Sequence, residues 1–341
     1  MKVCTIGCGG HSSDVHGPAQ QKAASQRGIH LAACCDLNES LAEKYRARFG
    51  FERSYTDIQT MIDRESPDVI CLIVPTHVTC DLAVDIIRQG IPLFLEKPPG
   101  LGTAELDRMR AAADAGKVPN QVAFNRRYMP VVARTHDILE THLPPEAVQQ
   151  INYEMTRFDR RDADFSTTAI HAIDAVRFLA RSPYQEVQIS YREMPWMGGG
   201  VAAFTLDGTC ESGTQVRINI QPIAGKTSEG ACIHAAEHTL RLSLLGADGR
   251  QFQGYLEHWQ KDRLAERFQV TGDLIDRNGT YGEFSAFLDA VSEGRAPAPG
   301  LDDCHQQMTL MEALRRRLPR VDFAETLRLS LKPELVISRQ P

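Results

Sequence analysis

Residues 1–12 read MKVCTIGCGGHS, an apolar run that leads directly into a cluster of glycines. A dinucleotide-binding fold needs Gly7 for a tight turn and Gly9 for close approach of the backbone to a pyrophosphate at the following helix N-terminus. Gly10 completes the cluster. Ser12 stands where the third glycine of that motif is found, and a residue that small still permits close packing. By itself, the GxGxxS pattern is also consistent with an ordinary turn between a strand and a helix.

The rest of the first 124 residues alternates between apolar runs and segments with helical periodicity. Thr79 and Thr103 are candidate N-caps of two of these helices, and Gly90 and Gly116 stand where C-terminal glycines are expected. Strands that are apolar on both faces and alternate with helices predict a doubly wound parallel sheet. The runs that we assign to its strands span residues 2–6, 30–35, 68–74, 91–95 and 118–124.

Beyond this first domain, residues 1–124, the sequence changes to period-two alternation, which is typical of strands in series. The dipeptides Asp207-Gly208 and Asp248-Gly249 fit hairpin turns. Strands in series beside few helices predict a second, α+β domain over residues 125–341, with an antiparallel sheet. Its last helices can pack back on the first domain. We expect helices near residues 167–180, 281–293 and 304–318.

Length and composition agree with a soluble protein of two domains. The 341 residues exceed the roughly 250 to 300 at which a single core stops growing. A net charge of −6 gives no reason to expect nucleic acid as a partner. Neither a secretory signal nor an apolar run long enough to span a membrane is visible. Nine cysteines without a CxxC spacing suggest buried thiols in a reducing cytoplasm.

Asp36 ends the second apolar run, where a carboxylate can accept hydrogen bonds from both ribose hydroxyls of a dinucleotide. The same charge repels a 2′-phosphate, and no arginine follows in Leu37 or Asn38. NAD(H) is therefore favoured over NADP(H). Asp36 lies farther from Gly7 than the usual spacing of about 20 residues, and a simple turn aspartate is the alternative interpretation.

Two further segments end strands at the edge of the sheet where doubly wound folds bind ligands. VPTHVT places Pro75 and Thr76 there, and FLEKPPG places Glu96 and Lys97. A lysine facing the ligand crevice can polarise a carbonyl or take a hydroxyl proton. Desolvation beside a cationic nicotinamide lowers the pKa of such a lysine toward the working range. The alternative is a surface Glu-Lys pair at the end of a strand.

Taken together, these segments resemble the Gfo/Idh/MocA family, named for glucose-fructose oxidoreductase and inositol dehydrogenase. The resemblance covers essentially the whole chain. It implies an N-terminal Rossmann domain, a C-terminal α+β domain with a large, mostly antiparallel sheet, and a nicotinamide cofactor in the cleft. Homo-oligomers, dimers or tetramers, built by packing the sheets, are also implied. The segments that carry the resemblance are IGCGGHS, VPTHVT, Glu96-Lys97-Pro98, FNRRYMP at 124–130, AIHAIDAVRFL at 169–179 and EFSAFLDAVSEGRAPAPG.

The resemblance also implies roles for individual residues. Lys97 corresponds to the catalytic lysine beside the nicotinamide, and His171 to the histidine of a D-x-x-x-H element. Asp174 shares a helical face with His171 and can orient it. Asn125 and Arg126 are expected between cofactor and substrate. The full set expected to bind the cofactor is Gly7, Gly9, Gly10, Ser12, Asp36, Pro75, Thr76, Glu96 and Lys97.

Simpler interpretations exist for three of these residues. His171 can be a satisfied histidine at the start of a helix. Arg126 and Arg127 can form salt bridges between the domains.

The chain departs from the family pattern at two positions. Thr167 stands four residues before His171, where the family usually has aspartate, and Thr79 stands where many members have histidine. The first change removes a carboxylate that often contacts the reacting hydroxyl. The proton relay would then consist of the lysine and His171 alone, unless Asp162 or Asp164 substitutes.

The sequence therefore predicts an NAD(H)-dependent oxidoreductase that transfers hydride to or from a secondary alcohol or ketone of a sugar, polyol or sugar-derived acid. A non-catalytic NAD(H)-binding regulator and an NAD-dependent, redox-neutral glycosidase remain open as alternatives. We expect a small-molecule substrate and no metal site. His234 and His238 have a metal-ligand spacing, but they run into a strand without carboxylate partners.

Overall fold

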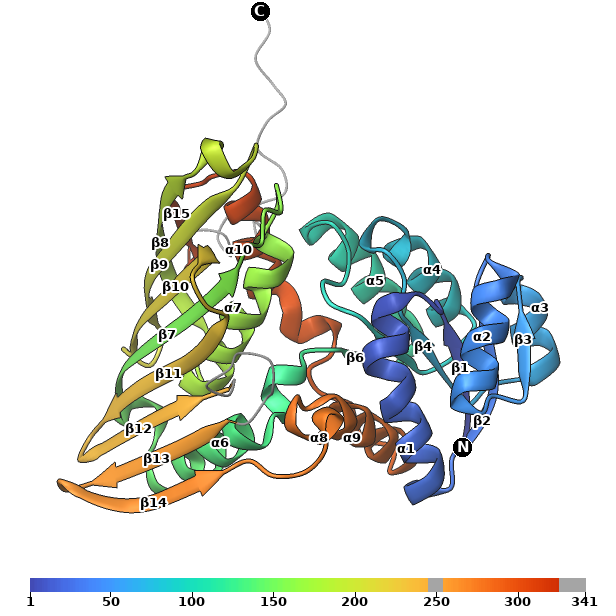
Figure 1. Ribbon diagram of the computed structural model, residues 1–341, viewed down its shortest axis with the longest axis horizontal. Helices are drawn as coiled ribbons and strands as arrows, with labels where there is room; N and C mark the ends of the chain where they lie inside the picture. Colours follow the sequence, from blue (N-terminus) through green and yellow to red (C-terminus); the bar gives the residue numbers. More distant parts are fainter. Residues whose placement is uncertain (245–253, 325–341) are drawn as a thin grey trace, which may run out of the picture.

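The computed structural model describes residues 1–244 and 254–324, which form two sheets with their own helices (Figure 1). The first sheet is parallel, with strand order β3-β2-β1-β4-β5-β6. The order reverses between β1 and β4, so the crevice outside the carboxyl ends of these strands is the expected ligand site. The predicted doubly wound sheet is confirmed, although β3 was not foreseen. The strands are β1 (Lys2–Ile6), β2 (His30–Cys35), β3 (Arg53–Tyr55), β4 (Val69–Leu72), β5 (Leu93–Leu95) and β6 (Asn120–Val122).

The helices of the first sheet begin close to the predicted positions, but three predicted end residues are wrong. Helix α5 (Thr103–Gly116) has Gly102 as its N-cap and includes Thr103 and Gly116, so the left-handed position falls to Lys117 with φ 49°. Helix α4 begins at Thr76 after Pro75, and Thr79 is therefore not an N-cap. The Thr79 hydroxyl instead donates to the Pro75 carbonyl at 3.3 Å, one turn back along the helix. Gly90 follows α4 with φ 77°, as predicted for a glycine at a helix end. The elements are η1 (Ser12–His16, a π-helical turn), α1 (Gly17–Arg27), α2 (Glu39–Phe49), α3 (Ile58–Glu65), α4 (Thr76–Arg88) and α5 (Thr103–Gly116).

The second sheet has nine strands in the order β14-β13-β12-β11-β7-β10-β9-β8-β15. All neighbours pair antiparallel except β7 and β10, which are parallel. The predicted α+β character is confirmed. The strands are β7 (Val148–Phe158), β8 (Tyr184–Glu193), β9 (Ala202–Cys210), β10 (Gln215–Ala224), β11 (Ser228–Ala235), β12 (His238–Ser243), β13 (Tyr255–Gln260), β14 (Arg263–Gln269) and β15 (Arg320–Asp322).

The predicted hairpin turn at Asp207-Gly208 is wrong, because both residues lie inside β9. A Cβ on Gly208 would lie 2.6 Å from the Glu186 carbonyl of β8, so the glycine serves close strand contact rather than a turn. The chain turns at residues 211–214 instead, where Gly213 has φ 87°. Asp248-Gly249 lies outside the described residues.

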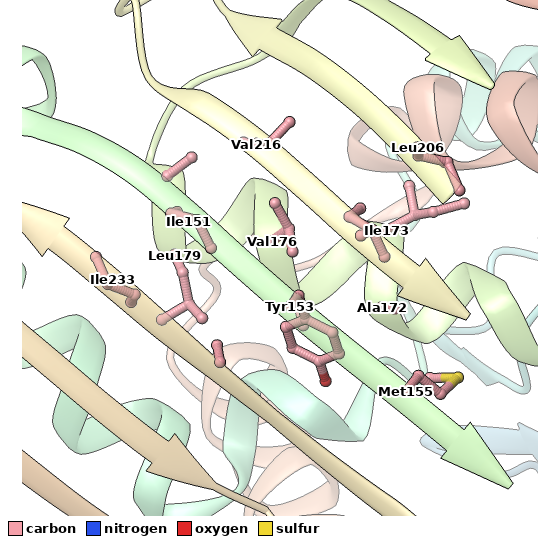
Figure 2. Packing of buried hydrophobic residues seen from close by; sticks show 14 of the residues in the cluster. Ile151, Tyr153, Met155, Ala172, Ile173, Val176, Leu179, Leu206, Val216 and Ile233 are labelled. Carbon is pink, nitrogen blue, oxygen red and sulfur yellow. The ribbon is translucent and has the colours of Figure 1, made fainter. Parts of the chain in front are cut away.

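Three helices, α6 (Pro130–His142), α7 (Ser166–Ala180) and α10 (His305–Arg315), cover the face of the second sheet that is turned toward the first (Figure 1). Figure 2 shows the packing at its centre, where Ile173 and Val176 of α7 share a core with Ile151 and Tyr153 of β7. The 15-residue helix α7 is apolar on nearly every side, which is typical of a helix enclosed by other elements.

The closing helices contact both parts of the chain. Helix α9 (Thr280–Ser292) packs on the parallel sheet, where the rings of Phe284 and Phe287 lie 5.8 and 5.6 Å from that of Phe94. Met308 and Met311 of α10 join a core of the same sheet. Within the described residues, no helix combines the length and apolarity needed to cross a membrane. The remaining short helices are η2 (Asn125–Tyr128), η3 (Pro145–Ala147), η4 (Pro195–Met197), α8 (Leu274–Arg277) and η5 (Leu301–Cys304).

Candidate active site

The glycine loop after β1 leaves open space at the start of a helix. Gly7 has φ 94°, and a Cβ there would lie 2.0 Å from the Ile73 carbonyl oxygen, so no larger residue fits. Gly9 and Gly10 have no atom within 4 Å of where a Cβ would be. The chain is helical from Gly10, and the first N–H groups of a helix have no partner inside it. An anionic group therefore fits at this point of the loop.

Ser12 plays a packing role rather than contacting this open space with its side chain. The side chain is buried, and its hydroxyl donates to the Tyr45 hydroxyl of α2 at 3.1 Å. A second close approach lies one turn later, where a Cβ on Gly17 would meet the Phe49 ring at 2.4 Å. No local pattern indicated this role of Gly17, because Phe49 of α2 is distant along the chain.

A cavity of about 550 Å³ lies beside the glycine loop and between the ends of β2 and β4. Its walls are mainly apolar and include Leu37, Pro75, Val78 and Leu82, and Asp36 lies at its edge. A flat, weakly polar group such as an adenine ring fits such walls. Thr76 is the first residue of α4 directly after Pro75.

Asp36 has a structural role in addition to its place at the cavity. One carboxylate oxygen accepts the Cys8 N–H of the glycine loop at 2.9 Å, and the other accepts the Asn38 N–H at 2.9 Å. Each carboxylate oxygen can accept a second hydrogen bond. The turn aspartate and the ribose ligand are therefore compatible interpretations of one residue.

Lys97 lies at the carboxyl end of β5 and connects the two parts of the chain. Its ammonium donates to the Thr167 carbonyl oxygen at the start of α7, at 3.4 Å. Burial lowers the pKa of Lys97 below its usual 10.5. Glu96 opposes this shift, whereas Arg126 and Arg160 add to it. A lysine with a lowered pKa can exchange a proton with a ligand more readily than a surface lysine.

His171 lies one turn after Thr167 on the same helix and is buried. Its Nδ1 has no hydrogen-bond partner among the described residues, so it is not the satisfied histidine of the simpler interpretation. Burial lowers the pKa of His171 well below 6.5, and the charges of Arg126 and Lys97 act in the same direction. The imidazole is therefore neutral at neutral pH.

Asp174 does not orient His171, which corrects that prediction. Its carboxylate is fully buried and accepts two hydrogen bonds from Arg127, at 2.9 and 2.6 Å, and one from Gln307 at 2.8 Å. A buried carboxylate needs a cationic partner, and Arg127 on η2 supplies it. Arg127 thus forms a salt bridge, but within the second domain rather than between the domains as predicted.

Arg126 also forms a buried salt bridge. Its guanidinium donates twice to Glu229 of β11, each time at 3.2 Å, and once to the Asn125 side-chain oxygen at 3.0 Å. The Asn125 amide donates to the Asn278 carbonyl at 2.8 Å. Both residues are thus engaged within the chain, and Arg126 influences the site through its charge on Lys97 and His171.

Comparison with known proteins identifies this arrangement. Residues 1–124 match the family model GFO_IDH_MocA, described as an oxidoreductase family with an NAD-binding Rossmann fold. The chain therefore has a Gfo/Idh/MocA Rossmann domain over residues 1–124. The predicted resemblance to this family is confirmed, as is the expectation of an NAD(P)-dependent dehydrogenase or reductase acting on CH–OH groups, because the related sequences are named dehydrogenases.

Two such relatives are a levoglucosan dehydrogenase from Pseudarthrobacter phenanthrenivorans and an inositol 2-dehydrogenase from Salmonella typhimurium. The first is 24% identical over 82% of this chain and 77% of its own length. The second is 23% identical over 56% of this chain and 58% of its own length. Among solved structures, a levoglucosan dehydrogenase in complex with NADH has a TM-score of 0.78 at 18% identity, covering 94% of this chain and 98% of its own. A dehydrogenase from Chromobacterium violaceum has a TM-score of 0.80 at 15% identity, covering 97% and 98%.

The carboxylate that is usual in Gfo/Idh/MocA enzymes is not replaced by either predicted substitute. Asp164 accepts the Ser166 N–H at 3.0 Å and pairs with Arg315 at 2.8 Å. Asp162 pairs with Arg160 at 2.8 Å. Both aspartates are therefore occupied by neighbouring groups rather than by Lys97.

A different carboxyl group, Glu283 on α9, is buried near the site. Burial, together with the charge of Glu96, raises the pKa of Glu283 well above 4.5, which favours the protonated form of its carboxyl group. Its Oε2 has no hydrogen-bond partner among the described residues. Sequence reasoning missed Glu283, because an acidic residue in the first turn of a helix usually serves the helix dipole.

Proposed function

We propose that this enzyme is an NAD(H)-dependent dehydrogenase that transfers hydride to or from a secondary alcohol or ketone of a sugar, polyol or sugar-derived acid. The observation that carries the proposal is the placement of Lys97, buried and with a lowered pKa, against the start of the helix that bears the neutral His171. The names of the levoglucosan and inositol dehydrogenases support the substrate class.

The chain offers a place for each part of the cofactor. The open helix start at Gly9 and Gly10 would hold the pyrophosphate, Asp36 the adenosine ribose, and the apolar cavity beside Pro75 the adenine. When bound, the nicotinamide accepts or gives the hydride. Lys97 in its neutral form takes the hydroxyl proton during oxidation, and in its charged form it returns a proton during reduction. His171, which is neutral, offers a second hydrogen bond to the reacting oxygen.

The decisive experiment is a substrate panel. Purified protein would be mixed with NAD or NADH and with sugars, inositols, sugar acids and their keto forms, and NADH would be followed by absorbance. We expect turnover with at least one member of the panel. Tight NADH binding without any turnover across the panel would count against a dehydrogenase.

The pH dependence of the reaction rate should reflect the protonation of Lys97. Alcohol oxidation needs the neutral amine, so its kcat/KM should rise with pH and level off below pH 10.5, because the pKa of Lys97 is lowered. Ketone reduction needs the ammonium and should decline over the same interval. Rate profiles in both directions would test this, and an oxidation rate that falls as pH rises would contradict it.

Two glycine variants separate the loop's two roles. Gly9→Ala should leave the apparent Tm within about 1 °C, because nothing in the chain lies within 4 Å of the added carbon. It should weaken NADH binding by about tenfold or more, because the carbon would occupy the space of the pyrophosphate. Gly7→Ala should lower both Tm and NADH affinity, since its Cβ would overlap the Ile73 carbonyl. Unchanged NADH affinity of Gly9→Ala would show that the pyrophosphate does not bind at this loop.

Asp36 is proposed to select NAD(H) over NADP(H). Asp36→Asn keeps an acceptor for the Cys8 N–H but removes the charge, so the preference for NADH over NADPH should fall by about tenfold, on the order of 1.4 kcal/mol. Dissociation constants from fluorescence titration with both cofactors would measure it. Asp63→Asn, an exposed aspartate on α3, is the control and should leave the preference unchanged.

We also propose a homo-oligomer, a dimer or tetramer, built on the face of the second sheet that α6, α7 and α10 leave uncovered. This face is polar, with Gln150 and Glu154 of β7 exposed, and with Arg217 of β10 paired to Asp207 of β9. Light scattering after size exclusion would measure the oligomer.

The domain boundary after residue 124 and a reducing, cytoplasmic setting are proposals as well; the latter agrees with nine unpaired cysteines, eight of them buried.

A further inference from the structure

Three side chains, His11, His16 and Glu96, converge beside the glycine loop. His11 and His16 have no role in the proposed mechanism, whereas Glu96 is also among the residues expected to bind the cofactor. The Glu96 Oε1 lies 2.9 Å from the His11 Nε2 and 2.6 Å from the His16 Nε2. One ligand atom from each of the three side chains lies within 4.8 Å of the others. In the described part of the chain, this is the one such group of three or more histidine, cysteine and acidic side chains.

An irregularity in the first helix creates this group. His11 and His16 are five positions apart, a spacing that places side chains on different sides of an α-helix. The segment η1 (Ser12–His16) is instead a π-helical turn, in which the Gly17 N–H donates to the Ser12 carbonyl. The wider turn brings residues five apart onto one side. Such turns are rare and occur frequently at functional sites.

Two of the three side chains are held in place before any ligand arrives. The His16 side chain is only 2% exposed, and its ring packs edge-on against Phe94 at 5.8 Å. The Glu96 side chain is 13% exposed, and its second oxygen accepts the Lys97 N–H at 2.9 Å. His11 is 57% exposed, so the group is open to solvent on one side. Two of the metal-binding side chains are therefore fixed, and the third is open to solvent, so an ion can enter the site from that side.

We propose that His11, His16 and Glu96 form a binding site for one divalent transition-metal ion of the Zn²⁺ or Co²⁺ type. Two imidazoles and one glutamate are a known zinc ligand set that leaves a position for water or another oxygen ligand. With bonds of about 2.0 to 2.1 Å, tetrahedral ligand atoms lie about 3.3 Å apart. The Glu96 oxygen and the two imidazole nitrogens must therefore separate by roughly 0.5 Å, and the exposed His11 can supply that movement.

The bound ion would tie the glycine loop to the end of β5, because two ligands come from the first helix and one from the segment after β5. An ion that binds only the folded chain raises its stability. Metal binding should therefore raise the apparent Tm, and this readout does not depend on any enzymatic activity.

Cobalt titration of the metal-free 341-residue chain tests the proposal. We expect one equivalent of Co²⁺ to bind with visible absorption bands, to be displaced by Zn²⁺, and to raise the apparent Tm. His11→Ala should lower the Co²⁺ affinity by about 100-fold or more, because even changes around metal ligands cost 10- to 100-fold. Since His11 is exposed, its replacement should leave the Tm of the metal-free protein nearly unchanged.

His30→Ala is a matched control. His30 also faces a carboxylate, with its Nε2 at 2.7 Å from Glu52, but the pair is exposed and has no second histidine. Its Co²⁺ affinity should equal that of the wild type. The proposal is overturned if the wild type binds no Co²⁺ below 1 mM (roughly −4 kcal/mol), or if His11→Ala binds it as tightly as the wild type. It is also overturned if binding is lost in Cys232→Ala, whose sulfur lies near His234, but not in His11→Ala.

Discussion

Lys97→Ala is expected to lower turnover by about 100-fold or more while leaving the affinity for NADH nearly unchanged. The Lys97 side chain is buried against the start of α7 and has a lowered pKa, so its removal takes away the amine proposed to exchange a proton with the reacting oxygen. NADH affinity should persist, because the contacts proposed for the dinucleotide lie at the glycine loop and at Asp36. Steady-state kinetics with the best substrate of the panel and NADH fluorescence titration would measure the two quantities.

Lys44→Ala is the control for this variant, because Lys44 lies exposed on α2. Its turnover should match that of the wild type. Unchanged turnover of Lys97→Ala would remove the lysine from the mechanism. Loss of NADH binding together with turnover would instead assign Lys97 to cofactor binding alone.

Asp174→Ala is expected to lower the apparent Tm by about 10 °C. The change leaves the guanidinium of Arg127 buried without its bidentate partner and also removes the acceptor of Gln307. Breaking a buried ion pair by removing one partner costs about 3 to 5 kcal/mol, which corresponds to a shift of this size in a domain of this length. Thermal unfolding followed by circular dichroism would measure it.

Glu293→Ala provides the comparison, since Glu293 and Arg295 form an exposed pair at the end of α9. Exposed pairs contribute about 0 to 1 kcal/mol, so this Tm should change by no more than about 3 °C. Asp174→Asn, which keeps one acceptor, should fall between the two. A normal Tm for Asp174→Ala combined with a raised KM would return Asp174 to the substrate site.

The fold was predictable from the sequence to the extent that local pattern determines it. The apolar runs at residues 2–6 and 30–35 are strands because both faces of a parallel sheet are buried, and such strands carry no polar alternation. The short strand β3 (Arg53–Tyr55) was missed, because an edge strand of three residues has too little apolar character to be recognised. Gly208 was misread as a turn residue, because only the neighbouring strand β8 shows why glycine is needed there.

The candidate site also has a part that was predictable from the sequence and a part that was not. Gly7 and Asp36 follow their strands directly and Lys97 follows β5 after one residue, so the parallel topology alone brings them to one edge of the sheet. The partner of Asp174 was not predictable, since a helical spacing shows which residues share a face but not which charge lies opposite. That partner is Arg127, which lies 47 positions away in the sequence.

The sequence by itself therefore determined the parallel sheet, the resemblance to the family and the residues at the ends of the strands, because these depend on periodicity and on neighbours along the chain. Only the tertiary structure decided which charges are paired, that burial raises the pKa of Glu283, and that His11 and His16 meet at Glu96. The physical reason is that burial and charge pairing depend on distances between segments that are remote in sequence. A local pattern does not encode those distances.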